Sequence, residues 1–367
     1  MVALNKNSAV PLYEQLKVEL TKLIVSGAFK SRRDFYSLSE IVGKYNVSQI
    51  TARRVIDELA AEGYLKTAKG KKPRVTTSRT RNDLSRMLKV AIFFYSESNA
   101  EAIEYDQMPW TNMIFSGLQE KLLEKNALWS MVPAASSNDA LLKLAQLQEE
   151  HDAFICLSPS IEEKLTGAFE KLRKPYVIIQ PYKEERSYNF VAADSYRGSM
   201  EMAERAVLKN YKSFLYLFKD KDENPEKLRG FQEALLRKDI PPQNIHIRIA
   251  GSDSEEKVAG VFEDFIKEQD KAELLPLAVY SFGDRLSMRV VSACSKLGLR
   301  VPEDVGVAGS TGMPEAEHCV PPLTTIQIPM RKMGNAAAEM IFEMLSVGNC
   351  RLPGVKLDVK LVKRASL

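Results

Sequence analysis

The side chains whose types and spacing could do chemistry gather first near the start of this 367-residue chain. An amide, an apolar side chain and two guanidinium groups stand close together at Gln49, Ile50, Arg53 and Arg54. Glutamine and arginine can hydrogen-bond base edges in the major groove of DNA, and isoleucine could contact a thymine methyl group. Cations that could neutralise phosphates follow, with a glycine that lets the backbone approach closely. These residues are Lys69, Gly70, Lys71, Lys72 and Arg74.

Catalytic and metal chemistry have no comparable cluster in the sequence. The G-x-S-x-G, Walker A and H-E-x-x-H motifs are missing, and His151, His246 and His318 lie far apart. The four cysteines have no C-x-x-C spacing, which argues against a zinc site or a disulfide framework. We therefore expect a protein that is not an enzyme and that needs no cofactor or metal ion.

The charge distribution indicates a polyanionic partner for the N-terminal region alone. Residues 1–78 hold 14 Lys and Arg against 7 Asp and Glu, whereas residues 79–367 hold 38 against 41. A basic head on a slightly acidic body indicates that the head meets a polyanion and that the body does something else. No stretch has the apolar length of a signal peptide or a membrane span, so we expect a cytoplasmic protein.

Three helices and a hairpin are predicted to position the basic cluster. Pro11 begins a helical pattern, and the spacing of Ser37 and Glu40 predicts a capping box at the start of a second, short helix. Ser48 can cap a third helix, whose outer face would carry Gln49, Ile50, Thr51, Arg53 and Arg54. The stretch 64–76 predicts a short hairpin with a basic tip. This order of elements is typical of a winged helix-turn-helix that reads DNA.

Three short sequence segments within residues 10–76 carry a family resemblance. They are Pro11-Leu-Tyr-Glu-Gln15, Val47-Ser48 followed by Thr51-Ala-Arg53, and Leu59-Ala-Ala-Glu-Gly63-Tyr-Leu65. This region resembles the GntR family of winged-helix regulators, which implies DNA binding. The family usually has arginine at the positions of Ser39 and Gln49 and threonine at that of Ile50, so the usual operator sequence does not carry over. The expected DNA-binding residues are Ser39, Ser48, Gln49, Ile50, Thr51, Arg53, Arg54, Lys69, Gly70, Lys71 and Lys72.

From Lys89 onward, short β-branched or aromatic runs alternate with amphipathic stretches, which predicts an α/β architecture with parallel sheets. The expected strands are Lys89–Tyr95, Ala127–Val132, Ala153–Leu157, Tyr176–Ile179, Phe190–Ala193, Phe214–Phe218, Ile245–Ile249, Leu277–Phe282 and Val305–Gly309, with Thr324–Ile328 and Lys356–Lys363 added near the end. This number of strands is expected to divide into two doubly wound parallel sheets.

The same region carries a second resemblance. Its segments are Gly298-Leu-Arg-Val-Pro-Glu-Asp-Val-Gly-Val-Ala-Gly309, Pro321-Pro-Leu-Thr-Thr-Ile326 and Met333-Gly334. Residues 89–345 resemble the LacI-type effector-binding module, which is akin to periplasmic binding proteins. With the GntR-like head, the whole chain resembles the arabinose-repressor type of regulator. In that family a sugar or related effector binds between two lobes, and the lobes form the dimer.

We therefore expect three segments in the chain. Residues 1–76 would be a winged helix-turn-helix domain, residues 77–88 a linker, and residues 89–367 a bilobed effector-binding and dimerisation module. Lobe 1 would hold residues 89–187 with 321–340, and lobe 2 residues 188–320 with 341–367.

Effector ligands are expected at the carboxyl ends of the strands, where loops of doubly wound sheets converge. The candidates are Tyr95, Ser96, Trp110, Ser158, Gln180, Asp194, Lys227, Asp284 and Thr311. The family's customary arginine, asparagine and aspartate are replaced here by Lys227, Gly283 and Thr311. Asp194 could equally cap a helix, and Trp110 could equally be a core or dimer-face aromatic residue.

Together these features predict a DNA-binding transcriptional repressor of carbohydrate-utilisation genes. A homodimer would bind a palindromic operator. A sugar or sugar-like effector between the lobes would change the DNA affinity through its different affinity for two conformations. Because three customary sugar partners are replaced, the alternative stays open that the body is only an oligomerisation module without a diffusible ligand.

Overall fold

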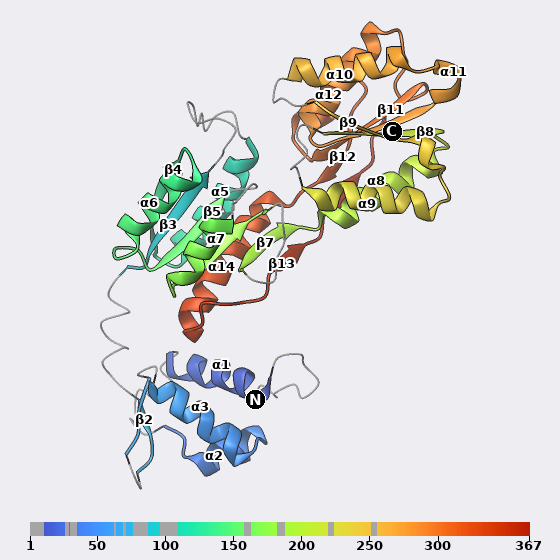
Figure 1. Cartoon of the computed structure of the whole chain (residues 1–367). Helices are drawn as coiled ribbons and strands as arrows, with labels where there is room; N and C mark the ends of the chain where they lie inside the picture. Colours follow the sequence, from blue (N-terminus) through green and yellow to red (C-terminus); the bar gives the residue numbers. More distant parts are fainter. Residues whose placement is uncertain are drawn as a thin grey trace.

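The computed structural model describes residues 11–25, 29, 35–61, 64–68, 71–75, 87–95, 109–157, 163–181, 188–218, 224–250 and 255–367. The predicted DNA-binding residues Lys69 and Gly70 and the predicted effector-binding residues Ser96 and Ser158 lie outside these residues, as does the side chain of Tyr95. Within them the chain forms an N-terminal head and a body of two lobes (Figure 1). No helix among the described residues is long and apolar enough to cross a membrane.

The head is a cluster of three helices followed by a small antiparallel hairpin. Its elements are α1 (Leu12–Val25), α2 (Leu38–Tyr45), α3 (Gln49–Ala61), β1 (Leu65–Lys66) and β2 (Arg74–Val75). Leu16 and Leu20 of α1 are fully buried against Val55 and Leu59 of α3, and Ile41 of α2 completes this core. The apolar periodicity of each helix thus buries one face and leaves the other to solvent.

The helix ends in the head form at the capping signals of the sequence. Ser37 Oγ accepts a hydrogen bond from the Glu40 N–H at 3.3 Å, and the Glu40 carboxylate accepts one from the Ser37 N–H at 2.6 Å, which is a complete capping box. Asn46 ends α2 in the left-handed region at φ 51°. Ser48 Oγ then accepts the Thr51 N–H at 3.0 Å and caps α3. These contacts fix the orientation of α3 within the head.

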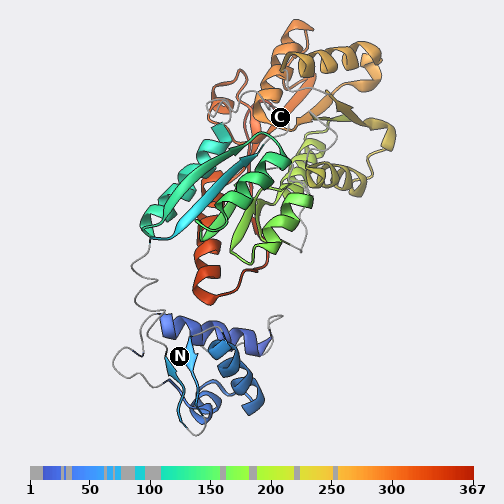
Figure 2. The ribbon, with the colours of Figure 1, turned by 60° about the vertical axis from the view of Figure 1, so that its left-hand side comes forward.

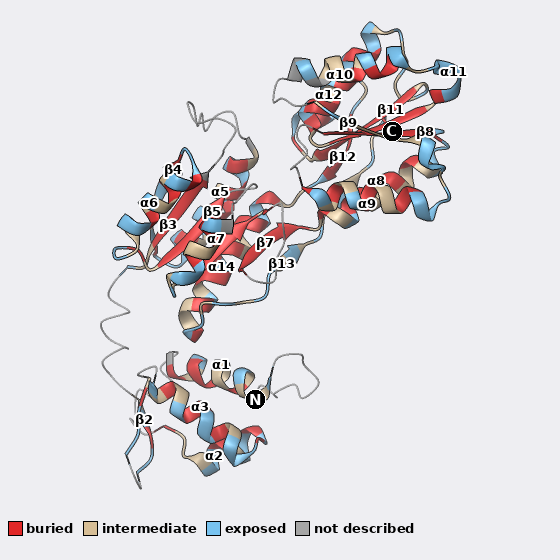
Figure 3. Cartoon of the chain, in the orientation of Figure 1, coloured by how far each residue is buried: buried red, intermediate tan, exposed pale blue. Residues whose placement is uncertain are grey.

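Lobe 1 is built on a six-stranded parallel sheet with the order β13-β7-β6-β5-β3-β4. Its strands are β3 (Lys89–Tyr95), β4 (Leu128–Ala134), β5 (Ala153–Leu157), β6 (Tyr176–Ile179), β7 (Phe190–Ala193) and β13 (Val355–Leu357). One face is covered by α5 (Pro109–Glu124) and α14 (Met330–Val347), and the other by α6 (Ser137–Leu147) and α7 (Glu163–Lys171). The central strands β3, β5, β6 and β7 are buried on both sides (Figure 3), as parallel sheets require, whereas the edge strands β4 and β13 are partly exposed.

Lobe 2 repeats this three-layer plan with one antiparallel edge. Its sheet has the order β14-β12-β11-β10-β8-β9, and only the β12–β14 pair is antiparallel. The strands are β8 (Ser213–Phe218), β9 (Ile245–Ile249), β10 (Leu277–Ser281), β11 (Val305–Thr311), β12 (Thr324–Gln327) and β14 (Lys360–Val362). The helices are α8 (Ser195–Leu208) with α9 (Pro225–Arg237) on one face and α10 (Glu255–Glu268) with α12 (Asp284–Lys296) on the other. Short helices α11 (Lys271–Leu274), α13 (Glu315–His318) and η2 (Pro242–Asn244) lie in the connections.

The division between the lobes differs from the expected boundaries. Strand β7 and strand β13 belong to the sheet of lobe 1, although we expected residues 188–320 and 341–367 in lobe 2. Strand β12 pairs in lobe 2, and the whole of α14 packs on lobe 1. The expected single strand Lys356–Lys363 is two strands, one in each sheet. Periodicity identifies a strand but not its partner, because pairing depends on residues far away in the sequence.

The chain therefore crosses between the lobes three times, and Figure 2 shows these segments from a second side. The crossings follow β7, β12 and β13, and two of them are joined where the Asp194 N–H donates to the Leu357 carbonyl at 2.9 Å. From the second crossing α14 runs along lobe 1, and α1 of the head lies against its far end in both views. One helix thus connects the junction of the lobes with the head.

Helices α5 and α14 pack backbone to backbone through two glycines. A Cβ atom on Gly334 would lie 2.0 Å from the Ile114 carbonyl oxygen, and one on Gly117 would lie 2.0 Å from the Arg331 carbonyl oxygen. Real side-chain atoms cannot come so close to a backbone oxygen, so only glycine allows this approach. The Met333-Gly334 motif of the sequence therefore has a packing role in lobe 1.

Candidate functional site

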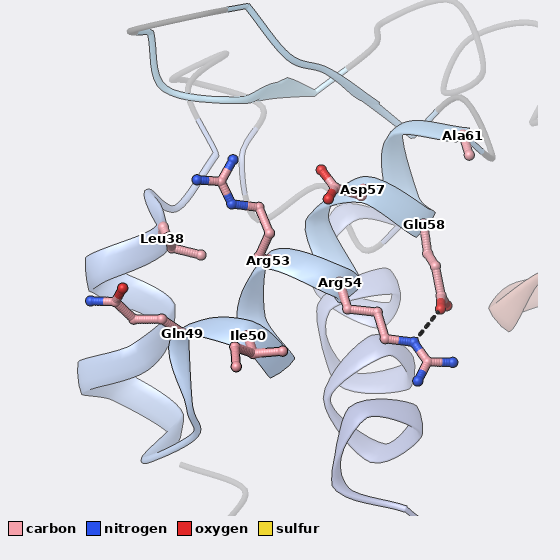
Figure 4. Close-up of a pocket in the computed structure, with 8 residues that line it drawn as sticks. All are labelled: Leu38, Gln49, Ile50, Arg53, Arg54, Asp57, Glu58 and Ala61. Atoms are coloured by element: carbon pink, nitrogen blue, oxygen red, sulfur yellow. Dashed lines mark hydrogen bonds and ion pairs between the residues drawn. The ribbon is translucent and has the colours of Figure 1, made fainter.

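The outward face of α3 carries the predicted nucleic-acid-binding residues of the head. Figure 4 shows Ile50 between Gln49 and Arg54 at the start of the helix, and the side chains of Arg53 and Arg54 pointing in opposite directions. Ile50 is 83% exposed, and Gln49 and Arg53 are exposed as well. Together with their neighbours they line an open hollow of about 700 Å³, whose residues are Leu38, Gln49, Ile50, Arg53, Arg54, Asp57, Glu58 and Ala61.

The opposite face of α3 fixes this helix firmly in the head. Ala52, Val55 and Leu59 are fully buried, and Ile56 is nearly so. Burial of each large apolar side chain stabilises the packing of α3 in the head by about 1.5–3 kcal/mol. The outward side chains are thus presented on a rigid element, as recognition of a nucleic acid requires.

The side chain of Arg54 is held by contacts within the head. Its guanidinium group stacks on the Tyr13 ring of α1 at 3.7 Å, and its Nε donates to Glu58 Oε1 at 3.0 Å. Lys17 of α1 lies 3.1 Å from the other oxygen of Glu58. Partial burial by itself would raise the pKa of Glu58, but the hydrogen bonds from Arg54 and Lys17 outweigh it and hold the pKa below its usual value. Arg54 therefore links α3 to α1.

Arg53 and Gln49 differ from Arg54 in this respect. Within the described part of the chain, neither side chain forms a hydrogen bond or an ion pair. Arg53 leaves the helix on the side opposite to Arg54 (Figure 4). An exposed guanidinium group and an exposed amide beside it retain their full set of donors and acceptors for another molecule.

The hairpin is attached to the start of α2 through a lysine. Lys72 Nζ donates to both carboxylate oxygens of Glu40, at 2.9 and 3.0 Å. The Phe35 N–H also donates to the Pro73 carbonyl at 2.8 Å. The hydrogen bond from the Ser37 backbone, together with Lys72, lowers the pKa of Glu40 to about 2. Lys72 thus orients the hairpin, and the side chains of both Lys71 and Lys72 are exposed.

The three hydroxyl residues of the predicted set lie around the helix starts. Ser48 caps α3 by accepting the Thr51 N–H, and the hydroxyl oxygens of Ser48 and Thr51 are 2.8 Å apart. Ser39 is exposed in the first turn of α2, with its Oγ 3.1 Å from Ser37 Oγ. These residues shape the two helix N-termini, where backbone N–H groups and helix dipoles favour anions.

In the body, Asp284 lies at the start of α12 and is only 1% exposed. Its Oδ2 accepts the Met313 N–H at 2.6 Å, and its Oδ1 accepts the Thr325 hydroxyl at 2.5 Å. The Asp284 N–H in turn donates to Thr311 Oγ1 at 3.4 Å. Burial raises the pKa of Asp284, and these hydrogen bonds act against that shift. The structure thus brings two predicted effector residues together, Asp284 and Thr311, in a network that joins α12, β11 and β12.

The other polar candidates are each bound inside the protein. Lys227 is 4% exposed, donates to the Phe282 carbonyl at 3.2 Å and lies 4.2 Å from the centre of the Phe282 ring. Asp194 Oδ1 accepts the Arg197 N–H at 3.1 Å and caps α8. Gln180 has a left-handed backbone at φ 55°, and its Oε1 accepts the Ala193 N–H at 2.9 Å. These contacts support structural roles for all three residues.

Two further residues of the body show what the sequence pattern missed. Met313 follows β11 of lobe 2 but is buried in the core of lobe 1, where Trp110 also packs. Thr325 lies within the segment 321–326 that carries the second resemblance, but it was not among the predicted site residues, and it is the partner of Asp284. In the sequence, the one signal for Met313 is that an apolar residue directly follows a glycine. In the structure this glycine, Gly312, has a φ of 72°. Met313 therefore links the network around Asp284 to the other lobe.

Comparison with known proteins gives a consistent result for the body. The family model described as a periplasmic binding protein-like domain matches residues 203–367. The chain is 24% identical over 352 residues to the arabinose metabolism transcriptional repressor of Geobacillus stearothermophilus, which covers 93% of each chain.

Solved structures of regulators share the fold. The complex of the transcriptional regulator CelR with cellobiose has a TM-score of 0.65 at 18% identity and covers 95% of this chain and 99% of that chain. The lac repressor dimer bound to operator has a TM-score of 0.65 at 19% identity and covers 79% of this chain and 98% of that chain. The body of this chain therefore has the periplasmic binding protein-like fold, and the chain is similar to transcriptional repressors rather than to enzymes.

Proposed function

We propose that this chain is a ligand-controlled transcriptional repressor that binds its operator through α3. The observation that carries the proposal is the outward face of α3, where Gln49, Ile50 and Arg53 are exposed on a helix anchored by its other face. This combination of amide, apolar and guanidinium groups matches the major groove, in which bases present acceptors, donors and a methyl group. The similarity to the arabinose repressor supports the same function.

We assign DNA binding to residues 1–76 and propose that they act as a winged helix-turn-helix of the GntR type. The order α1, α2, α3 and then the β1–β2 hairpin supports this assignment. In this reading α3 enters the major groove, and the hairpin, held to α2 by Lys72 and Glu40, places Lys71 near the phosphates. A homodimer would bring two such heads to successive major grooves, about 34–36 Å apart, on a palindromic operator.

We assign effector binding and dimerisation to residues 89–367. Three crossings between the lobes form a hinge of the kind that closes around a ligand in two-lobed proteins. Helix α14 leads from the second crossing to α1, which is tied to α3 by Tyr13 and Lys17. A movement of the lobes would therefore reach the DNA-binding face. The arabinose repressor and the cellobiose complex among similar proteins favour a sugar or sugar derivative as effector.

A second candidate function follows from the polar residues of the body. Gln180, Asp194, Lys227 and Asp284 all form hydrogen bonds within the protein. Polar residues that are all hydrogen-bonded within the protein are expected in a body that has no diffusible ligand and serves only to join two copies of the chain. In that case the chain would be a DNA-binding repressor that responds to its own concentration.

One experiment tests the first proposal and separates it from the second. Binding sites are selected from random duplex DNA with the full chain, and the affinity is then measured by fluorescence anisotropy with and without pentoses, hexoses and their phosphates. A true effector changes the DNA affinity and raises the thermal stability of the body, by about 2.7 kcal/mol at a concentration of 100 times its Kd. Selective DNA binding without any sugar effect supports the second candidate. Absence of any selected sequence contradicts both.

A further inference from the structure

One apolar side chain stands out on the surface of the head. Among the described residues of the head, Ile50 is the one large apolar side chain that is exposed, at 83%. It lies in the first turn of α3, and the remaining large apolar residues of that helix face the core. The exposure of Ile50 is therefore set by its position on the outward face and not by a gap in the packing.

The neighbours of Ile50 define what it would meet. Gln49 and Arg53, which flank it, form no hydrogen bond or ion pair within the described part of the chain. Arg54, on its other side, is turned toward α1 by Tyr13 and Glu58 (Figure 4). Ile50 thus lies between two side chains that can form new hydrogen bonds and one that is already engaged.

In the major groove one base carries an apolar group at its edge. Thymine has a C5 methyl group, whereas the other groups that bases present there are hydrogen-bond donors and acceptors. Glutamine pairs with adenine and arginine with guanine in the same groove. We propose that Ile50 reads the C5 methyl group of one thymine in each operator half-site, between contacts of Gln49 and Arg53, and that Arg54 is a positioning residue without a base contact.

This inference rests on the proposed function, and its test uses deoxyuridine. Starting from a sequence selected by the full chain, each thymine of the operator is replaced in turn by deoxyuridine, which removes only the methyl group and keeps the base pair. The Kd of the wild-type chain is expected to rise about fourfold at one position in each half-site, as for one buried methyl group at about 0.8 kcal/mol. Replacement at both half-sites should give about fifteenfold.

Two variants complete the experiment. The effect of deoxyuridine at that position should disappear in Ile50→Ala, which binds the thymine and deoxyuridine operators equally. It should persist in Arg54→Ala, because Arg54 does not contact the base. Because Ile50 is exposed, Ile50→Ala is expected to keep the thermal stability of the wild type, and the melting curves of both variants are the control for folding.

The possible outcomes distinguish a failure of the proposed function from a failure of the proposed contact between Ile50 and thymine. If no sequence is selected, the proposed function fails. If a sequence is selected but no deoxyuridine replacement weakens binding, or if the loss is the same in Ile50→Ala, the reading of thymine by Ile50 is wrong and the proposed function stands. If the deoxyuridine effect disappears in Arg54→Ala although that variant is folded, the assignment of Arg54 as a residue that Ile50 does not need for its contact with thymine is wrong.

Discussion

The network around Asp284 makes a quantitative prediction for the body. Replacement of Asp284 by alanine removes the acceptor for the Met313 N–H and for the Thr325 hydroxyl, both of which are buried. Each buried donor left without a partner costs about 1–3 kcal/mol, so the variant should lose about 4 kcal/mol of unfolding free energy. For a domain of this size 1 kcal/mol corresponds to about 3 °C, and the melting temperature of the body should fall by about 12 °C.

The conservative variant and a matched control sharpen this prediction. Asp284→Asn keeps an acceptor for Met313 and can donate to Thr325 Oγ1, so a loss of only about 1 kcal/mol is expected. Asp194→Ala removes a partly exposed helix cap at the start of α8 and should also cost about 1 kcal/mol. Melting is followed by calorimetry on the full chain. If Asp284→Ala melts no lower than Asp194→Ala, the network does not hold the lobes as we argue.

Three further predictions follow from the head and lobe 1. Glu40, with a pKa of about 2 against an ordinary 4.5, contributes stability above pH 4.5 that is lost as the pH falls toward 2; NMR titration should show this pKa, and Lys72→Ala should raise it. Gly334→Ala should destabilise the body by about 3 kcal/mol in chemical unfolding, because its Cβ would meet the Ile114 carbonyl, and a wild-type midpoint would contradict that packing. Arg53→Ala should weaken specific operator binding by about 1–3 kcal/mol in anisotropy titrations, and unchanged affinity would mean that α3 does not read DNA.

Local signals in the sequence predicted much of the fold. The capping box at Ser37 and Glu40 and the cap at Ser48 both form as expected, because each involves residues within one turn of the helix that it starts. Most strands lie within a residue or two of their expected ranges, because their apolar runs are buried on both faces of a parallel sheet. The outward face of α3 could also be predicted, because the apolar residues of α3 recur with helical spacing on the opposite face.

The candidate effector residues were harder to judge from the sequence. Their positions at strand ends were predicted correctly for Gln180, Asp194 and Thr311. Their hydrogen bonds within the protein were not predicted, because the partners of Asp284 and Lys227 stand 27 to 55 residues away in the sequence. A strand-end polar residue that binds a ligand and one that binds a neighbouring backbone group have the same sequence pattern.

The sequence alone determined the elements of this protein, the basic head and the outward face of α3, because periodicity and capping act over a few residues. Only the tertiary structure decided which strands share a sheet, so that β7, β12 and β13 lie in lobes other than those expected. It also decided that Arg54 and Lys72 are bound within the head whereas Arg53 points outward. The physical reason is that strand pairing and ion pairing depend on distances between segments far apart in the chain, which no local pattern contains.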